Sequence, residues 1–353
     1  MTSLAMIEAA AERLRGRARR TPLLSSPFLD EIAGRRLFVK AECLQHTGSF
    51  KFRGGWSALS ALDPETRKRG VIAYSSGNHA QGVALAAQAH GVPSVIVMPA
   101  DAPKLKIDNT RALGAEVVLY DRINGESREA VAAPLVEARN LTLIKPYDDP
   151  QVIAGQGTVG LELAEQAAAE NITQADVLVC CGGGGLTTGI ALALEARAPD
   201  LRVRPAEPEG FDDMARSLRS GQVQSNPATS GSICDAILTP TPGDLTWPEI
   251  SRLCGPGLSI TDDEALHALA LAFQRLKIVL EPGGAAALAA ALFRPDEIPP
   301  PLRLTHPIHL FRNIPGSARG SAPRPCQQST SGLSCAWRLN SARSRRKSPH
   351  APR

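Results

Sequence analysis

Short runs of β-branched residues alternate with alanine-rich stretches over the first 300 residues of this chain, and this rhythm strongly constrains its fold. The strand-like runs are Leu37–Lys40, Gly70–Tyr74, Ser94–Met98, Glu116–Tyr120, Thr142–Lys145, Asp176–Cys180 and Leu201–Arg204. The helical patterns are Ala80–Ala89, Ser127–Ala138, Val159–Ala169, Gly189–Ala196 and Asp262–Leu276. Because strands that alternate with helices pair in parallel, the sequence predicts an α/β fold of parallel sheets flanked by helices.

Two unusual motifs directly follow predicted strands. The glycine run Gly182–Gly185 comes after Asp176–Cys180, and the polar run Ser75–His79 comes after Gly70–Tyr74. Parallel α/β folds bind their ligands at the carboxyl ends of strands, where loops lead into helices. We therefore expect both motifs to line a binding site.

Length and composition are typical of a globular protein. The 353 residues suffice for one large or two ordinary domains, and 43% of them are hydrophobic. Apolar runs stay short of 18 residues, so no membrane span is expected, and the first 20 residues resemble an amphipathic helix rather than a signal peptide. Seven cysteines without a CxxC pair favour free thiols in the cytoplasm over disulfides or a structural zinc site.

Charge is divided unevenly along the chain. Ten of the 39 basic residues and none of the 35 acidic ones lie in residues 301–353, so the first 300 residues hold 29 basic and 35 acidic side chains. An acidic body argues against nucleic-acid binding. The tail of residues 301–353 contains seven prolines, eight serines and nine arginines without periodicity, and we predict that it is disordered.

Lys51 lies among small, polar and glycine residues between His46 and Gly55. A desolvated lysine loses its proton readily and can form a Schiff base with an aldehyde. The alternative is a solvated surface charge, which is the state of most lone lysines. The turn-forming residues Thr47–Ser49 and the pair Gly54–Gly55 favour the reactive interpretation, because they permit a ligand to approach closely.

The run Gly182–Gly185 has the features of a phosphate-binding turn. Backbone amides at a helix N-terminus bind a phosphate when no Cβ obstructs them. A dinucleotide fingerprint fails because Thr187 and Thr188 stand where its third glycine is required, and a P-loop fails because Ile190 follows Gly189. A flexible loop is the remaining alternative. A reactive lysine together with a phosphate-binding turn indicates pyridoxal phosphate.

Two further motifs have weaker meaning by themselves. Ser75–His79 could bind a carboxylate through hydroxyls and free amides, or could simply cap a helix. The acidic run Glu207–Asp213 could hold a hard divalent cation, or could be a solvated loop. Glu281–Ala285 indicates only a helix start with glycines.

Four motifs in this order resemble the fold-type II pyridoxal-phosphate enzymes, within the branch of threonine/serine dehydratases, serine racemases and 3-hydroxyaspartate dehydratases. The motifs are Thr47–Gly54, Ser75–Gly82, Gly182–Leu186 and Glu281–Ala285. The resemblance covers about residues 5–298. It implies a homodimer whose subunit has a large cofactor-binding domain (residues 1–69 and 147–300) and a small domain (residues 70–146).

The resemblance also implies a role for each matched residue. Lys51 would carry the cofactor and then move the α-proton, and Ser76 would be the acid/base on the opposite face in a racemase. Phe50 would pack beside the pyridine ring, and Asn78 would bond its ring oxygen. The phosphate would be held by Gly182, Gly183, Gly184, Gly185 and Leu186. The substrate carboxylate would be bound by Ser75, Ser76, Gly77 and His79. The ligands of a Mg²⁺ or Mn²⁺ ion would be Glu207, the Phe211 carbonyl and Asp213.

The implied activity is that of an ammonia-lyase, which converts a 3-hydroxy amino acid to a 2-keto acid and ammonia. Threonine and serine are possible substrates, and so is 3-hydroxyaspartate, whose second carboxylate would need an extra cation. An amino-acid racemase that uses Lys51 and Ser76 is the first alternative. A pyridoxal-phosphate-binding protein inactivated by its altered terminus is the second.

One departure from the family pattern lies near the C-terminus. Family members continue from the helix after Glu281 into a strand that ends in a Ser-Gly-Gly-Asn type motif, whose serine faces the pyridine nitrogen. Here the corresponding segment, Pro307–Gly316, lacks such a motif. We hypothesise that the sequence after about residue 300 comes from a shifted reading frame or a replaced terminus.

Overall fold

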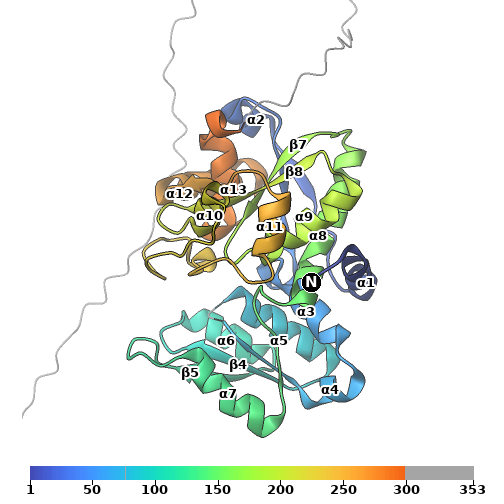
Figure 1. Cartoon of the computed structure of the whole chain (residues 1–353), viewed down its shortest axis with the longest axis vertical. Helices are drawn as coiled ribbons and strands as arrows, with labels where there is room; N and C mark the ends of the chain where they lie inside the picture. Colours follow the sequence, from blue (N-terminus) through green and yellow to red (C-terminus); the bar gives the residue numbers. More distant parts are fainter. Residues whose placement is uncertain (76, 299–353) are drawn as a thin grey trace, which may run out of the picture. The chain divides into compact units, whose positions relative to one another are not determined.

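The β-branched runs form two parallel sheets (Figure 1). The computed structural model describes residues 1–75 and 77–298. The four-stranded sheet has the order β5-β4-β3-β6, with β3 (Val71–Tyr74), β4 (Ser94–Pro99), β5 (Glu116–Tyr120) and β6 (Thr142–Leu143). The three-stranded sheet has the order β7-β8-β9, with β7 (Ala175–Cys180), β8 (Leu201–Pro208) and β9 (Leu258–Ile260). The predicted parallel α/β architecture is therefore confirmed.

The four-stranded sheet is covered on both faces. Successive side chains of a strand point to opposite faces, and β3 follows this rule, since Val71 enters one hydrophobic core and Ile72 another. Val71 shares its core with Leu59 of α3 (Lys51–Ala61) and residues of α5 (Asn78–His90). Ile72 instead packs in a core with Ala132 of α7 (Arg128–Arg139). Strands buried on both faces explain the continuous apolar runs of the sequence.

The three-stranded sheet is likewise enclosed by helices. Val179 of β7 packs in a core with residues of α8 (Pro150–Ala169) and α9 (Gly185–Arg197). Its neighbour Leu178 packs against the core formed by α12 (Asp262–Leu271) and α13 (Pro282–Phe293). Strand β7 therefore lies between two layers of helices, and it ends at the glycine run. The turn is held in place by the packed elements on both faces of this strand.

The remaining elements connect these layers. The antiparallel strands are β1 (Leu23–Ser25) and β2 (Phe38–Lys40). The other helices are α1 (Leu4–Leu14), α2 (Pro27–Ala33), α4 (Pro64–Arg69), α6 (Lys104–Ala112), α10 (Asp213–Ser220) and α11 (Trp247–Leu253). Single turns occur at η1 (Glu42–Leu44), η2 (His46–Gly48), η3 (Asp235–Ile237), η4 (Ala272–Leu276) and η5 (Pro295–Glu297). Among the described residues, no helix is both long and apolar enough to cross a membrane.

Several element boundaries differ from the sequence predictions. The helix expected from Val159 begins at Pro150, because the Asp149 side chain accepts backbone N–H bonds from the first turn. The strand expected to end at Arg204 continues to Pro208, which places Glu207 inside β8 rather than in a loop. The helix expected to run to Leu276 changes to a π-turn after Leu271. Strands β1 and β9, which have three residues each, were not predicted.

Two of the sequence predictions are left open. The division into a domain of residues 1–69 and 147–300 and a domain of residues 70–146 stays a prediction. The tail of residues 301–353, with the segment Pro307–Gly316, lies outside the described residues, and so does Ser76.

Candidate active site

Lys51 is the first residue of helix α3, and its amine points to a backbone carbonyl. Its Nζ donates a hydrogen bond of 2.6 Å to the oxygen of Pro146. Desolvation by the surrounding protein lowers the pKa of Lys51 to about 8, although the negative charge of Glu281 opposes the shift. Far more of this lysine is therefore neutral near pH 8 than of an ordinary lysine. A neutral amine is the form that attacks an aldehyde.

The backbone leading into α3 is sharply turned. Thr47 and Gly48 both have positive φ, at 58° and 76°. Phe50 precedes the helix, and Lys51 Nζ lies 5.4 Å from the centre of its ring. The aromatic ring predicted to lie beside the cofactor is thus next to the reactive amine, while its contact with a pyridine ring stays a prediction.

The glycine run forms a turn in which side chains would collide with their neighbours. A Cβ on Gly183 would lie 2.2 Å from the ring of Tyr147, and one on Gly185 would lie 2.9 Å from the Tyr147 carbonyl oxygen. Gly184 has φ of 92°, a left-handed conformation that side chains disfavour. A Cβ on Gly182 would be 3.3 Å from Ile237, so this glycine is less tightly enclosed.

Neighbouring groups fix the orientation of the turn. Gly183 O accepts bonds from Thr246 Oγ1 at 2.7 Å and from the Gly243 N–H at 3.2 Å. Helix α9 starts at Gly185, and its first amides, including that of Leu186, have no earlier turn to bond. Such a helix N-terminus attracts a phosphate. The turn is also linked to the lysine, because Lys51 bonds Pro146 and the next residue, Tyr147, packs on Gly183.

Buried polar atoms around this region that have no hydrogen-bond partner among the described residues include Thr47 Oγ1, Ser49 Oγ, His79 Nδ1 and Thr187 Oγ1. Ser49 lies two residues before Lys51, and Thr187 lies two residues after the glycine turn. Buried polar groups in proteins are nearly always bonded. A ligand with a phosphate and polar ring substituents would supply such partners, so the residues present fit pyridoxal phosphate.

The motif after β3 is placed as the sequence predicts, at the start of helix α5. The Gly77 N–H donates to Ser75 Oγ at 3.2 Å, and Asn78 is the first helical residue. His79 is 2% exposed, and its Nε2 is 2.9 Å from Ile144 O. Burial lowers the pKa of His79 to about 3, and the positive charge of Lys51 adds to this effect. His79 is therefore neutral at pH 7, and its role in binding a substrate carboxylate stays a prediction.

The sequence did not assign a function to Glu281, which the structure places at the site. Its Oε1 accepts a hydrogen bond from Asn78 Nδ2. Burial raises the pKa of Glu281, with Asn78 and the cations Lys106 and Lys51 opposing the shift. The contact joins α5 to the start of α13 through two residues that are 203 positions apart, so no local spacing could have revealed it.

Of the predicted metal ligands, Glu207 lies inside β8, Phe211 follows that strand, and Asp213 is the first residue of α10. Glu207 is fully buried, and its oxygens accept the N–H groups of Met214 and Ala215 at 3.1 and 2.8 Å. Asp213 Oδ1 accepts from Asn226 at 2.6 Å, whereas its Oδ2 has no partner among the described residues.

The electrostatics of this acidic pair are unfavourable without a cation. Burial raises the pKa of Glu207 above its ordinary range, and the charge of Asp213 contributes. Burial raises the pKa of Asp213 to about 6. Two buried carboxylates and a backbone carbonyl are hard oxygen donors that fit Mg²⁺ or Mn²⁺. The described residues contain no group of three or more His, Cys, Asp or Glu side chains arranged for a metal.

A polar recess of about 220 Å³ is lined in part by Pro146, whose carbonyl oxygen accepts the hydrogen bond of Lys51 Nζ, although Lys51 itself is not among the lining residues. The recess also contains two cations, Arg128 and Lys145, and the acids Asp148 and Asp244. Sequence reasoning missed Arg128 and Lys145. Their positions in a helical pattern and at a strand end carry no recognisable motif.

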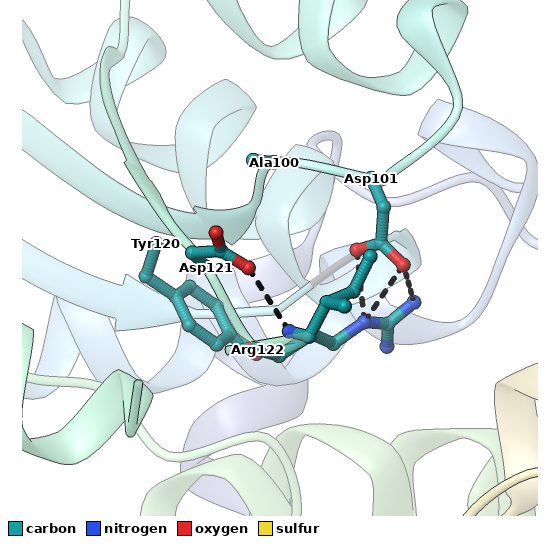
Figure 2. A pocket seen from close by; sticks show the side chains of 6 residues that line it. Ala100, Asp101, Tyr120, Asp121 and Arg122 are labelled. Carbon is teal, nitrogen blue, oxygen red and sulfur yellow. Dashed lines mark hydrogen bonds and ion pairs between the residues drawn. The ribbon is translucent and has the colours of Figure 1, made fainter. Parts of the chain in front are cut away.

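A second recess of about 250 Å³ lies at the ends of β4 and β5, and none of the predicted site residues lines it (Figure 2). Its cation Arg122 donates to Asp101 at 2.8 Å, and Asp121 accepts the N–H of Ile123 at 3.1 Å. Arg122 and Asp101 thus bond each other, and Asp121 bonds the backbone of its own loop, so the charged side chains of this recess already have partners.

Comparisons with known proteins agree with this geometry. The family model described as "Pyridoxal-phosphate dependent enzyme" matches residues 14–305. The L-threo-3-hydroxyaspartate ammonia-lyase of a Pseudomonas species is 46% identical over 283 residues, which cover 80% of this chain and 86% of the relative. Serine racemase of Arabidopsis thaliana is 41% identical over 287 residues, covering 81% of this chain and 84% of the relative.

Solved structures show the same relationship. The crystal structure of a T.th. threonine deaminase has a TM-score of 0.79 at 45% identity, and the match covers 84% of this chain and 94% of that one. Serine racemase from Dictyostelium discoideum has a TM-score of 0.77 at 38% identity, and covers 84% and 94% of the two chains. The chain described here therefore belongs to the pyridoxal-phosphate dependent enzymes and has the two-sheet α/β fold of their fold-type II members.

Proposed function

We propose that this enzyme is an ammonia-lyase that converts a 3-hydroxy amino acid to a 2-keto acid and ammonia, with Lys51 as its catalytic residue. The observation that carries this proposal is the placement of Lys51. Its amine has a pKa lowered to about 8 and is joined through Pro146 and Tyr147 to a glycine turn suited to a phosphate. The similarity to ammonia-lyases acting on hydroxyaspartate and threonine supports the reaction type.

We assign the following roles to residues of this chain. Lys51 Nζ would hold the cofactor through its aldehyde carbon and, once released by the substrate amine, would take the α-proton. The bound cofactor supplies a ring that accepts electron density when that proton leaves. The amides of Gly182–Leu186 would fix the phosphate, and Ser75 with Gly77 would bind the substrate carboxylate. Asn78, held by Glu281, would orient toward the ring oxygen.

The recess beside Pro146 suggests how the substrate is chosen. 3-Hydroxyaspartate has a second carboxylate, and the cations Arg128 and Lys145 line the same recess as Pro146, the hydrogen-bond partner of Lys51. Arg128 is held over the ring of Tyr74, with 4.6 Å between its Cζ and the ring centre, and its Nε also bonds Glu129 at 2.7 Å, so a substrate carboxylate would compete with Glu129 for this cation. We therefore propose 3-hydroxyaspartate as the preferred substrate, with oxaloacetate as the product, over threonine and serine, which lack a group for these cations to bind.

A substrate-dependent substitution tests this preference. In Arg128→Gln, kcat/KM for 3-hydroxyaspartate should fall about 10- to 100-fold, because a charge-assisted hydrogen bond contributes about 1.5–3 kcal/mol. The values for threonine and serine should change little. Arg139→Gln, on the same helix but paired to Glu116 at the surface, is the matched control and should leave both unchanged. Equal losses for all substrates in Arg128→Gln would refute a selective role.

The racemase alternative is favoured by the similarity to serine racemases and by the same Lys51. It needs an acid/base on the other face, for which Ser76 is the candidate. Release of the D-enantiomer from L-serine, measured by chiral chromatography, would identify this activity. The other alternative, an inactive cofactor-binding protein, predicts neither racemisation nor keto-acid release from any hydroxy amino acid.

We also propose a Mg²⁺ or Mn²⁺ ion at Glu207, Asp213 and the Phe211 carbonyl, a homodimer, and a cytoplasmic location. The unpartnered Asp213 Oδ2 supports the metal site. Either cation should raise Tm in the wild type and leave Tm unchanged in Asp213→Asn. The dimer is checked by a mass measurement in solution, such as light scattering, and the location by fractionation of the source cells.

The decisive experiment for the activity is keto-acid release from a panel of hydroxy amino acids, run with Mg²⁺ and with a chelator. We expect release from 3-hydroxyaspartate and weaker release from threonine or serine. Borohydride treatment of the loaded enzyme, followed by peptide mass spectrometry, should place the cofactor on Lys51. A cofactor trapped on another lysine would overturn the site assignment. Absence of keto-acid release from every hydroxy amino acid would overturn the lyase assignment.

A further inference from the structure

Helix α3 carries a second basic residue, Arg53, whose side chain is buried on the side of the helix away from the reactive amine. Residues two apart on an α-helix point about 200° apart, so the side chains of Lys51 and Arg53 leave the helix in nearly opposite directions. Arg53 is 1% exposed, and it is among the largest fully buried side chains of the described residues. A guanidinium in such a place needs partners for its whole set of N–H donors.

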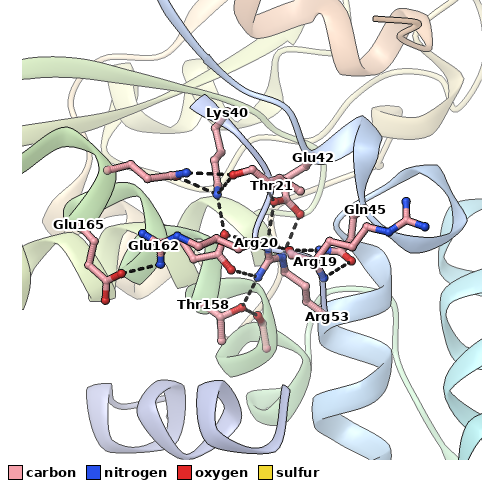
Figure 3. Close-up of polar contacts among 12 residues, drawn as sticks. Arg19, Arg20, Thr21, Lys40, Glu42, Gln45, Arg53, Thr158, Glu162 and Glu165 are labelled. Carbon is pink, nitrogen blue, oxygen red and sulfur yellow. Dashed lines mark hydrogen bonds and ion pairs between the residues drawn. The ribbon is translucent and has the colours of Figure 1, made fainter. Parts of the chain in front are cut away.

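Those partners come from three other segments of the chain (Figure 3). Nε and Nη2 of Arg53 donate to the two oxygens of Glu42, both at 2.9 Å. Nη1 donates to Glu162 at 2.7 Å and to Thr158 Oγ1 at 3.2 Å. Nη2 also donates to Glu162 and to the carbonyl oxygen of Arg19, both at 3.1 Å. We call these five residues the Arg53 network.

The carboxylates of the Arg53 network are themselves fixed. Lys40 Nζ donates to Glu162 at 2.5 Å, and Thr21 Oγ1 donates to Glu42 at 2.6 Å. Two carboxylates therefore face two cations in a region where the side chains of Lys40 and Glu162 are only 10% and 17% exposed. The network ties the first turn of α3 to η1, to α8 and to the loop after α1 with planar, bidentate geometry.

The start of α3 lacks the usual local device for fixing a helix end. The residue before the helix, Phe50, makes no side-chain capping bond. Arg53 occupies the third helical position and anchors this uncapped turn from its far side. The backbone of α3 is also packed tightly against glycines of two other helices. A Cβ on Gly82 of α5 would lie 2.9 Å from the Lys51 carbonyl, and one on Gly155 of α8 would lie 2.4 Å from the Arg53 carbonyl.

We propose that Arg53 is a positioning residue that, through Glu42 and Glu162, fixes the first turn of α3 and thereby aims the Lys51 amine at the cofactor aldehyde. The inference rests on the proposed role of Lys51. Replacing a buried ion network by apolar side chains often leaves a protein equally stable, so stability alone is a weak reason for this arrangement. The geometry supplies another reason, which is that the network fixes the direction of a reactive amine. Small misplacements of a catalytic group reduce the reaction rate strongly.

The test compares two buried arginines. Arg53→Lys keeps the charge but removes the planar fork, and Arg204→Lys makes the same change at a site that does not touch α3. Arg204 is 3% exposed and bonds Asp176, Pro256 O and Glu297 O from β8. Both variants should lower Tm, and only Arg53→Lys should disturb the cofactor.

Three readouts follow cofactor geometry in the loaded enzyme. In Arg53→Lys, kcat should fall about 10- to 100-fold while KM changes less than about threefold, because the substrate contacts remain. The visible circular dichroism of the lysine-linked cofactor should drop, since it reports the orientation of the chromophore, and borohydride trapping on Lys51 should slow. Arg204→Lys should match the wild type in all three.

A milder variant guards against simple misfolding. Glu42→Gln keeps the shape of one partner and removes its charge, so it should show the same changes in dichroism and kcat to a smaller extent. If Arg53→Lys and Glu42→Gln lower Tm but keep wild-type dichroism and kcat, the network is structural only and the inference is wrong. If wild-type enzyme is trapped on another lysine, the proposed function of Lys51 fails instead, which the same mass spectra distinguish.

Discussion

The glycine turn after β7 and the start of α3 place their functional groups in opposite ways. In Gly182–Gly185 the backbone itself is presented, and side chains are excluded by contacts such as that of Gly183 with Tyr147. At the start of α3 a side chain is presented, and the charged groups that we propose to orient it converge from distant segments onto Arg53. Binding a phosphate needs only correctly aimed amides, whereas proton transfer needs one amine at one position.

The contrast predicts that the lysine side of the site is the more sensitive to substitution. Lys51→Ala should reduce kcat by at least about a thousandfold, because it removes both the covalent attachment and the base. Steady-state keto-acid assays and borohydride trapping check this result. Lys106→Ala, a nearby lysine that also interacts with Glu281, is the control and should keep the cofactor attached. Full activity in Lys51→Ala would break the comparison.

The glycine turn should respond through cofactor affinity rather than through the chemical step. Gly184→Ala combines positive φ with a Cβ 2.8 Å from Thr246 Oγ1, and it should weaken cofactor binding between about fivefold and 150-fold, for a strain of about 1–3 kcal/mol. Equilibrium dialysis measures the change. Gly221→Ala has a similar φ of 72° but open space, so it should lower Tm without altering affinity.

The lowered pKa of Lys51 predicts the pH dependence of cofactor uptake. Below about pH 8 the amine is protonated and cannot attack, so the uptake rate should rise with pH and level off above that value. One pH unit below the midpoint only about a tenth of the amine is neutral, and the rate should be about tenfold lower. Stopped-flow absorbance measures the profile. A midpoint near that of an ordinary alkylamine would show that the amine is fully solvated.

The smallest effect on stability is expected for an ion pair at the surface. This pair serves as the exposed counterpart of the buried Arg53 network. Arg139 and Glu116 bond at 2.6 Å, but their side chains are 44% and 50% exposed. Arg139→Ala should change the free energy of unfolding by no more than about 0.5–1 kcal/mol, since water screens such pairs. Urea denaturation measures it. A loss as large as that of Arg53→Lys would contradict the importance assigned to burial.

The sequence allowed prediction of those features that depend on residues close to one another in the chain. The glycine turn and the motif around Lys51 each lie within about ten residues, and the βα rhythm repeats along the first 300. The parallel fold and the family are confirmed. The partners of Arg53 and of Asn78 were not predictable, because Glu162 and Glu281 are separated from them by 109 and 203 residues. Glu207 was expected in a loop, since a strand ending Arg-Pro-Ala-Glu-Pro shows no apolar alternation.

The wedging of α3 between Gly82 and Gly155 also bears on how this enzyme can be re-engineered. At these two positions any added atom would meet a main-chain oxygen, which no rotamer can avoid. A library intended to change substrate preference should therefore leave the helix contacts untouched and randomise Arg128 and Lys145 in the recess that Pro146 lines. If Arg128 selects the substrate as proposed, variation there would change substrate preference without shifting the helix that carries Lys51.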